Sequence, residues 1–252
     1  MVKQITSVEN TIIKDIAKLK DSSYRKKTDL CVVEGTRAIE TFISSEHELQ
    51  QIYATEPNIE FAQKIADEKK ITLVNYNVAT KISSATTPSG IAAVFKIKKP
   101  TAKLGQGLIL FQISDPGNMG TLIRTAAALN VKTVVVIEGV DVWTNKVIQA
   151  SAGTISKVDI FQMSFKELVE KKENLKLISL VVTGGKSPQE IDTKNSLLIV
   201  GSEAHGLPLQ VLNESDELMT LPMPGNIESL NVAVAGSIAL YQTYLNPSIQ
   251  NC

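Results

Sequence analysis

The stretch ISDPGNMGTLIRTAAALNV, residues 113–131, decides how the second half of the chain folds. It starts at the end of the apolar segment LILFQI, residues 108–113, whose composition is typical of a buried strand. Pro116 and Gly117 favour a sharp turn, and Asn118 is expected to cap the helix of small and aliphatic residues that follows. A strand, a short turn and a helix in succession are the building unit of a parallel α/β sheet.

The same alternation continues toward the end of the chain. Further apolar, β-branched segments predict strands at residues 133–139, 158–163, 177–184, 196–201 and 217–223, with helices between them. Strands of this composition favour a parallel sheet covered by helices on both faces. We therefore predict one α/β domain over residues 108–252.

A smaller α/β domain is predicted over residues 1–97, where helices and strands also alternate, beginning with a helix near 7–20. The polar segment KKPTAKLGQG, residues 98–107, contains Pro and Gly without periodicity, which is typical of a linker. The first residues alternate apolar and charged side chains, so they predict a helix and not a signal peptide. No apolar run approaches the length of a membrane span, and no membrane association is expected.

The composition, with 43% apolar and 21% charged residues, is that of a folded globular protein. Cys31 and Cys252 lie far apart and only two histidines are present, so neither disulfides nor a metal site is predicted, and a reducing cytoplasm is expected. The segment GQGLIL, residues 105–110, lacks the third glycine of a dinucleotide-binding turn, and VTGGKS, residues 182–187, has Leu180 where a phosphate loop requires glycine. These absences disfavour a conventional dehydrogenase, ATPase or zinc enzyme, and the lack of a G-x-S-x-G elbow disfavours an esterase.

The formal net charge is zero, from 26 basic and 26 acidic residues, so the chain lacks the overall basic balance of many nucleic-acid-binding proteins. The charge is uneven, because residues 1–107 hold 16 basic and 12 acidic residues while the remainder holds 10 and 14. Much of the basic excess lies in one cluster, which contains Lys14, Lys18, Lys20, Arg25, Lys26 and Lys27. The cluster is either a patch that contacts phosphates or a solvated helix face.

Three irregular segments follow strands of the larger domain: SDPGNMGTLIR at 114–124, GSEAHGL at 201–207 and LPMPGNIESLNVA at 221–233. Each combines Gly or Pro with a few polar side chains, as a site built largely from backbone groups requires. Because ligands on parallel sheets gather at the carboxyl ends of the strands, we expect the three segments to form one pocket.

The polar residues of these segments each allow a structural or a functional interpretation. Arg124 lies in a helix of otherwise apolar residues, so it either pairs with a carboxylate or faces a cleft. Glu203 is placed to orient a donor or to neutralise Arg124, whereas His205, alone in its loop, carries no specific signal for acid/base catalysis. Ser229 and Asn231 are each placed to cap the last helix, which is expected to begin at about Ser229.

The motifs DPGNMGTLIRTAAALNV, LIVGSEAHGL and LPMPGNIESLNVAVAGSIALY resemble, in order and spacing, the three motifs of the SpoU (TrmH) family of RNA ribose 2′-O-methyltransferases in the SPOUT superfamily. The resemblance covers most of residues 108–252, and residues 1–97 resemble the ribosomal-protein-like RNA-recognition domain that the family commonly adds. It implies a SPOUT-type parallel sheet with a C-terminal trefoil knot. Without it, an ordinary doubly wound sheet is predicted, because knots are rare exceptions to chain topology.

The resemblance also implies a cofactor and a set of site residues. S-adenosylmethionine is expected to lie bent in the knot, held largely by backbone groups of Gly201, Glu203, Gly206, Leu221, Met223 and Leu230. Arg124 is implied to be the catalytic arginine, and the site is implied to be shaped by Asn118, Glu203, Ser229 and Asn231. Either this arginine or a phosphate oxygen or water takes the proton, and no metal is needed. The candidate RNA-binding residues are Lys14, Lys18, Arg25 and Lys26.

The function implied is transfer of a methyl group from S-adenosylmethionine to a ribose 2′-hydroxyl of ribosomal or transfer RNA, with ribosomal RNA favoured. The family is usually dimeric, so the small-residue helix at 230–241 is expected either to pack at a homodimer interface or to be an internal core helix. Two alternatives remain: a non-catalytic RNA-binding or ribosome-assembly factor, and a small-molecule α/β enzyme that uses another nucleotide. Cofactor binding separates them.

Overall fold

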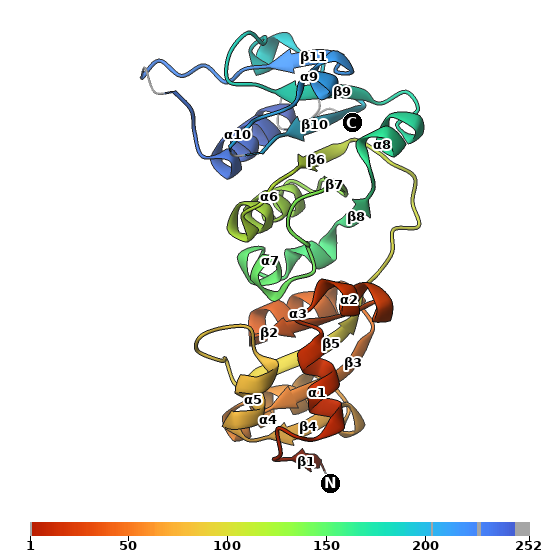
Figure 1. Ribbon diagram of the computed structural model, residues 1–252, viewed down its shortest axis with the longest axis vertical. Helices are drawn as coiled ribbons and strands as arrows, with labels where there is room; N and C mark the ends of the chain where they lie inside the picture. Colours follow the sequence, from red (N-terminus) through yellow and green to blue (C-terminus); the bar gives the residue numbers. More distant parts are fainter. Residues whose placement is uncertain (1, 203, 226–227, 245–252) are drawn as a thin grey trace. The chain divides into compact units, whose positions relative to one another are not determined.

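A computed structural model describes residues 2–202, 204–225 and 228–244. The chain divides into two compact units (Figure 1). The first contains the residues up to 98 together with 141–156, and the second contains 99–140 together with the residues from 157 onward. The predicted domain limits at 97 and 108 stay a prediction, and the contacts add that the segment 141–156 packs with the first unit.

The first unit is built on a mixed five-stranded sheet in the order β1-β4-β3-β5-β2. Strands β1 and β3 run parallel to β4, whereas β5 is antiparallel to both β2 and β3. The strands are β1 (Lys3–Ile5), β2 (Leu30–Glu34), β3 (Leu49–Ala54), β4 (Ile71–Val74) and β5 (Ile91–Lys96). The helices are α1 (Thr11–Lys18), α2 (Ser22–Thr28), α3 (Thr36–Ser44), α4 (Ile59–Ile65), α5 (Tyr76–Ile82) and α7 (Asn145–Ala150).

Helices cover both faces of this sheet because successive strand residues point to opposite sides. Ile13 and Ile16 of α1 share one core cluster with Ile82 of α5 and the strand residues on that face. Phe95 of β5 is not part of this cluster. Its ring contacts the Phe42 ring of α3, with ring centroids 5.1 Å apart. The apolar residues of the strands and helices that predicted an α/β domain are thus buried on both faces of the sheet.

The helix predicted near 7–20 is present as the shorter α1, and a second helix that was not predicted, α2, follows it. Asn10 caps α1 by accepting a hydrogen bond from the Ile12 main-chain nitrogen. The chain then turns, and the Asp21 side chain caps α2 by accepting from the main-chain nitrogens of Ser23 and Tyr24. Asp21 followed by Ser22 is a helix-start signal in the sequence. The short strand β1, which precedes α1, was not predicted either.

The second unit contains a six-stranded, fully parallel sheet in the order β11-β9-β10-β6-β7-β8. The prediction of a parallel sheet is therefore confirmed. The strands are β6 (Gly107–Phe111), β7 (Thr133–Ile137), β8 (Asp159–Gln162), β9 (Lys176–Leu180), β10 (Ser196–Val200) and β11 (Glu217–Met219). The helices are α6 (Pro116–Ala128), α8 (Phe165–Lys171), α9 (Leu209–Asn213) and α10 (Val232–Tyr244).

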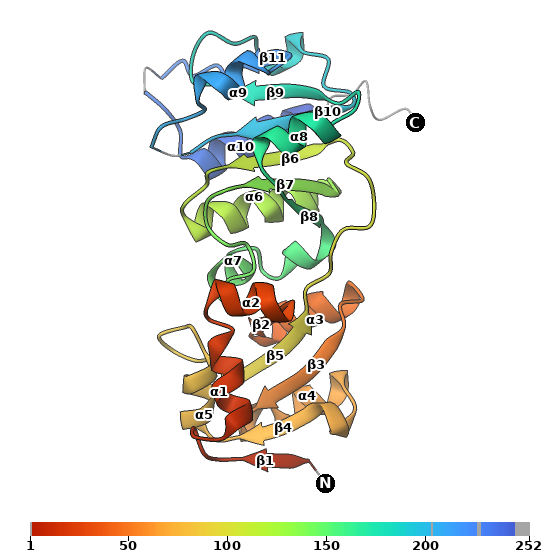
Figure 2. The same cartoon turned by 45° about the vertical axis from the view of Figure 1, so that its right-hand side comes forward.

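Helices cover both faces of the parallel sheet, as predicted (Figure 2). Leu168 of α8 and Val211 of α9 share a core cluster with the strands on one face. On the opposite face α10 packs closely against α6 and β10, because a Cβ on Gly236 would lie 2.6 Å from Leu122 Cδ2 and 3.1 Å from Val200 Cγ2. Across the described residues, no helix has the length and apolarity needed to cross a membrane.

Candidate active site

A pocket of about 580 Å³ lies at the carboxyl ends of the strands of the second unit. Its wall is formed by residues 180–182 at the end of β9, 200–202 and 204–206 at the end of β10, 221 and 223 after β11, and 229–232 and 235 around the start of α10. The volume lies in the range of about 300–1,000 Å³ that is typical of sites for small molecules. The second and third of the three irregular segments therefore meet at one pocket.

The loop after β10 folds back tightly against the strand end. The Gly206 main-chain nitrogen donates to the Ser202 carbonyl at 3.0 Å, and Gly206 has a φ of +65°. A Cβ on Gly201 would lie 2.8 Å from the Gly206 carbonyl carbon, so only glycine allows the two backbones to approach this closely. The closely packed backbones of these two glycines therefore form part of the pocket wall.

The cofactor residues implied by the sequence lie together. The pocket is lined by Gly201, Gly206, Leu221, Met223 and Leu230. Glu203 lies outside the described residues. Residues 180–182 also line the pocket and were not predicted as site residues, although the strand predicted over 177–184 contains them. His205, for which the sequence gave no specific role, also lines the pocket.

The start of α6 differs from the prediction, because Asp115 and not Asn118 is its cap. The Asp115 carboxylate accepts a hydrogen bond from the Asn118 main-chain nitrogen at 2.8 Å. Pro116 occupies the first helical position, where its fixed φ suits a helix and its missing N–H costs nothing, so the helix starts earlier than predicted. The Asn118 side chain is therefore available for another contact.

That contact joins the first and third motifs. The Asn231 Nδ2 donates to Asn118 Oδ1 at 3.2 Å, while Asn231 Oδ1 accepts from the main-chain nitrogens of Ala233 at 2.9 Å and Val234 at 3.3 Å. Asn231 thus caps α10, one of its two predicted roles, and also ties the start of α10 to the start of α6. Ser229 lines the pocket and does not cap the helix.

Arg124 lies on the exposed side of α6, whereas Leu122, Ile123 and Ala126 of the same helix are buried. Among the described residues no carboxylate forms an ion pair with its guanidinium. The first of the two interpretations of Arg124, pairing with a carboxylate, is therefore not seen among the described residues. Arg124 is exposed to solvent instead.

The basic cluster of the first unit is only partly an exposed patch. Lys14 forms an ion pair with Glu9 at 2.5 Å, and Lys18 forms one with Asp15 at 2.8 Å. Lys26 is exposed.

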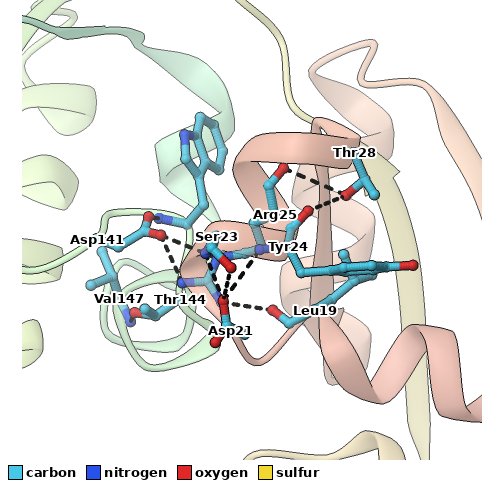
Figure 3. A network of polar contacts seen from close by, with 10 residues as sticks. Leu19, Asp21, Ser23, Tyr24, Arg25, Thr28, Asp141, Thr144 and Val147 are labelled. Carbon is cyan, nitrogen blue, oxygen red and sulfur yellow. Dashed lines mark hydrogen bonds and ion pairs between the residues drawn. The ribbon is translucent and has the colours of Figure 1, made fainter.

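Arg25, predicted to belong to that patch, is buried instead. Its Nη2 and Nε donate to Asp141 Oδ2 at 2.7 and 3.3 Å, and its Nη1 donates to the Leu19 carbonyl at 2.6 Å (Figure 3). The residue is 3% exposed, so it is not part of an exposed cationic surface. The Asp141 carboxylate, which is distant in sequence, draws the guanidinium inward.

No group of three or more His, Cys, Asp or Glu side chains that could hold a metal ion occurs among the described residues.

Comparison with known proteins gives a consistent assignment. Residues 106–241 match the model of the SpoU rRNA Methylase family, and residues 10–93 match that of the MRM3-like substrate binding domain. The chain belongs to the SpoU rRNA methylase family. The resemblance found in the three motifs is thereby confirmed, and the SpoU match includes the whole pocket described above.

Relatives of this SpoU chain extend over nearly its full length. It is 31% identical to an uncharacterized tRNA/rRNA methyltransferase of Synechocystis sp. (strain PCC 6803), over 96% of this chain and 93% of the relative. It is 30% identical to the 23S rRNA (guanosine(2553)-2′-O)-methyltransferase RlmP of Bacillus subtilis, over 95% and 98%. The fold is shared with the AdoMet-bound rRNA methyltransferase of Sinorhizobium meliloti, with a TM-score of 0.84, 23% identity and coverage of 96% and 97%.

Proposed function

We propose that this chain transfers a methyl group from S-adenosylmethionine to a ribose 2′-hydroxyl of ribosomal RNA. The observation that carries the proposal is the pocket at the strand ends, together with the Asn118–Asn231 hydrogen bond that brings the first motif beside the third. Both lie in the region that matches the SpoU family. The Bacillus relative is named a 2′-O-methyltransferase of 23S rRNA, which supports ribosomal RNA as the substrate.

The residues present fit S-adenosylmethionine. The close approach of Gly201 to Gly206 leaves a cradle of backbone that a Cβ would fill, and Leu221, Met223 and Leu230 supply an apolar wall. These five residues would hold the cofactor, and Glu203 is assigned to the same loop from its sequence position. When bound, S-adenosylmethionine supplies an already activated methyl group, so the protein's task is positioning and proton removal.

Arg124 is assigned to the RNA at the reacting nucleotide, where its guanidinium would bind the phosphate and orient the ribose. Its exposure and its lack of a described ion-pair partner support this role. Because a guanidinium is very hard to deprotonate, a phosphate oxygen or water takes the 2′-hydroxyl proton. Asn118, Ser229 and Asn231 shape the site between the two helix starts.

The architecture proposed around this site includes a C-terminal trefoil knot and a homodimer. Val234, Ile238 and Tyr241 are 47%, 42% and 55% exposed, and their spacing places them in one apolar stripe along α10. An exposed apolar stripe beside the pocket supports its burial against a second copy. The cytoplasm is the compartment that a ribosomal RNA substrate implies.

The first unit is proposed to recognise the RNA, since it contains the match to a substrate binding domain. Lys14, Lys18 and Lys26 are proposed to contact phosphates. Replacing all three with Gln is expected to weaken RNA binding and to flatten its salt dependence by about 2 in the logarithmic slope. An unchanged slope would show that these lysines form only a solvated face.

The decisive experiment is transfer of labelled methyl from S-adenosylmethionine to unmodified ribosomal and transfer RNA, followed by nuclease digestion and identification of the labelled nucleoside. A 2′-O-methylated nucleoside from ribosomal RNA is expected. Label on a base, or no label in either RNA while the folded protein binds the cofactor, would overturn the proposal and favour a non-catalytic RNA-binding factor.

A further inference from the structure

A second pocket, of about 180 Å³, lies within the first unit and has no role in the chemistry proposed above. Its apolar wall includes Leu19, Ile82 and Trp143, which are 4%, 1% and 7% exposed. Its rim carries the exposed side chains of Lys20 and Lys146. We refer to it as the Trp143 pocket. An aromatic, apolar interior with a cationic rim matches two of the three parts of a nucleotide, the base and the phosphate.

The charge of the Trp143 pocket is positive, because no acidic residue is among its described lining. The Asp141 carboxylate is paired with Arg25 at 2.7 Å. Glu34 is 3% exposed, and its carboxylate accepts hydrogen bonds from neutral donors, including the Asn145 Nδ2 at 2.6 Å. Lys20 Nζ donates to the Lys81 carbonyl at 2.9 Å, and burial lowers the pKa of its ammonium. The Glu34 carboxylate partly opposes this lowering, and an anion at the rim would add to its stabilisation of the Lys20 charge.

Asn145 contributes a second signal. Because its Nδ2 is held by the Glu34 carboxylate, its Oδ1 must act as an acceptor, yet this atom is buried and has no hydrogen-bond partner. A buried acceptor without a donor costs about 1–3 kcal/mol, so native structures usually satisfy it with protein, water or ligand. Asn145 is one of the residues that line the pocket, so its unsatisfied acceptor belongs to a side chain of the pocket wall.

We propose that the Trp143 pocket receives one unpaired nucleotide of the RNA substrate, with its base against Trp143 and its phosphate on Lys20 and Lys146. The inference rests on the proposed function, since it assumes an RNA substrate. The pocket is smaller than the roughly 300 Å³ at which sites for complete small molecules begin, which suits one base of a longer chain. Proteins that read RNA by sequence commonly bind such unstacked bases.

The test uses the full chain and two readouts. Trp143 is the only tryptophan of the chain, so its fluorescence reports directly from the pocket. Single-stranded oligoadenylate is expected to quench this emission. The K20Q/K146Q double variant is expected to bind unmodified ribosomal RNA about tenfold more weakly, with a salt slope lower by about 1–2. It should also lose the quenching by oligoadenylate.

The matched control is the K64Q/K69Q variant, which removes the same charge from two exposed lysines of the same unit away from the pocket. It is expected to retain both the affinity for ribosomal RNA and the quenching. Unchanged Trp143 emission, or equal losses in the two variants, would overturn the inference. Methyl transfer by the unaltered protein is measured in parallel. Transfer without any pocket effect refutes the pocket alone, whereas no transfer to any RNA refutes the proposed function.

Discussion

Replacement of Arg25 by alanine tests the buried polar network of the first unit. The Arg25 side chain is 4% exposed and the Asp141 side chain 16% exposed, and their closest atoms are 2.7 Å apart. The truncation leaves the Asp141 carboxylate with a hydrogen bond from the Trp143 main-chain nitrogen and no cation. It also removes the donor that the Leu19 carbonyl has in the native structure.

The expected cost follows from this geometry. Removing one partner of a buried ion pair destabilises by about 3–5 kcal/mol, because an uncompensated charge stays in a medium of low polarity. Asp141 retains some exposure, so water can partly solvate it, and we expect the lower end, about 3 kcal/mol. Such a loss lowers the folded-to-unfolded ratio about a hundredfold.

The assay is urea unfolding of the full chain, followed by the emission of Trp143. Lys27→Ala is the matched control, because Lys27 is an exposed cation of the same helix and its loss should change the free energy of unfolding by less than about 0.5 kcal/mol. In a double-mutant cycle with Asp141→Asn, the second change should cost much less than it does alone. A loss below about 1 kcal/mol for Arg25→Ala, or strictly additive losses, would refute the reasoning.

Three further outcomes are expected. Gly201→Val should lower the affinity for S-adenosylmethionine at least tenfold in calorimetry, because its Cβ would overlap the Gly206 backbone, and a native affinity would contradict the assignment of this loop. Arg124→Ala should nearly abolish methyl transfer while cofactor affinity stays within a few fold, and an equal loss of cofactor binding would contradict its role toward RNA. Burial lowers the pKa of His47 below its usual 6.5, and its Nε2 lies 3.2 Å from the Ser156 carbonyl oxygen. The neutral ring is therefore favoured by the fold, so the Tm should fall as pH drops below about 6.5, with a smaller pH dependence for His47→Gln.

Much of the fold is predictable from the sequence because its strands are short, apolar and β-branched. The burial of every residue of β6, β7 and β10 is encoded directly in LILF, TVVVI and SLLIV. Short helices are harder, because one turn carries little periodicity. The helix α2 was not predicted, because its start is set by the Asp21 side-chain cap, which a hydrophobic pattern does not register.

The candidate site shows the same division. The tight loop after β10 can be predicted from its glycines, because glycine adopts the backbone conformations that tight turns require. The prediction that Asn118 caps α6 was wrong: both residue types cap helices, and Pro116 at the first helical position makes Asp115 the cap. The hydrogen bond from Asn231 to Asn118 spans 113 residues, and no local pattern encodes such a distance.

The segment 141–156 lies inside the SpoU match in the sequence, yet in the structure it packs with the first unit. Glu34 is buried there, and its carboxylate accepts from the Asn145 Nδ2 while its carbonyl accepts from Gln149 Nε2. Arg25 likewise has its carboxylate partner in this segment. A fragment ending at residue 97 would therefore retain two buried charged residues without these partners, and burying a charge without compensation is costly. It follows that the first unit depends on residues supplied from beyond the linker, although its sequence alone has the composition of an independent domain.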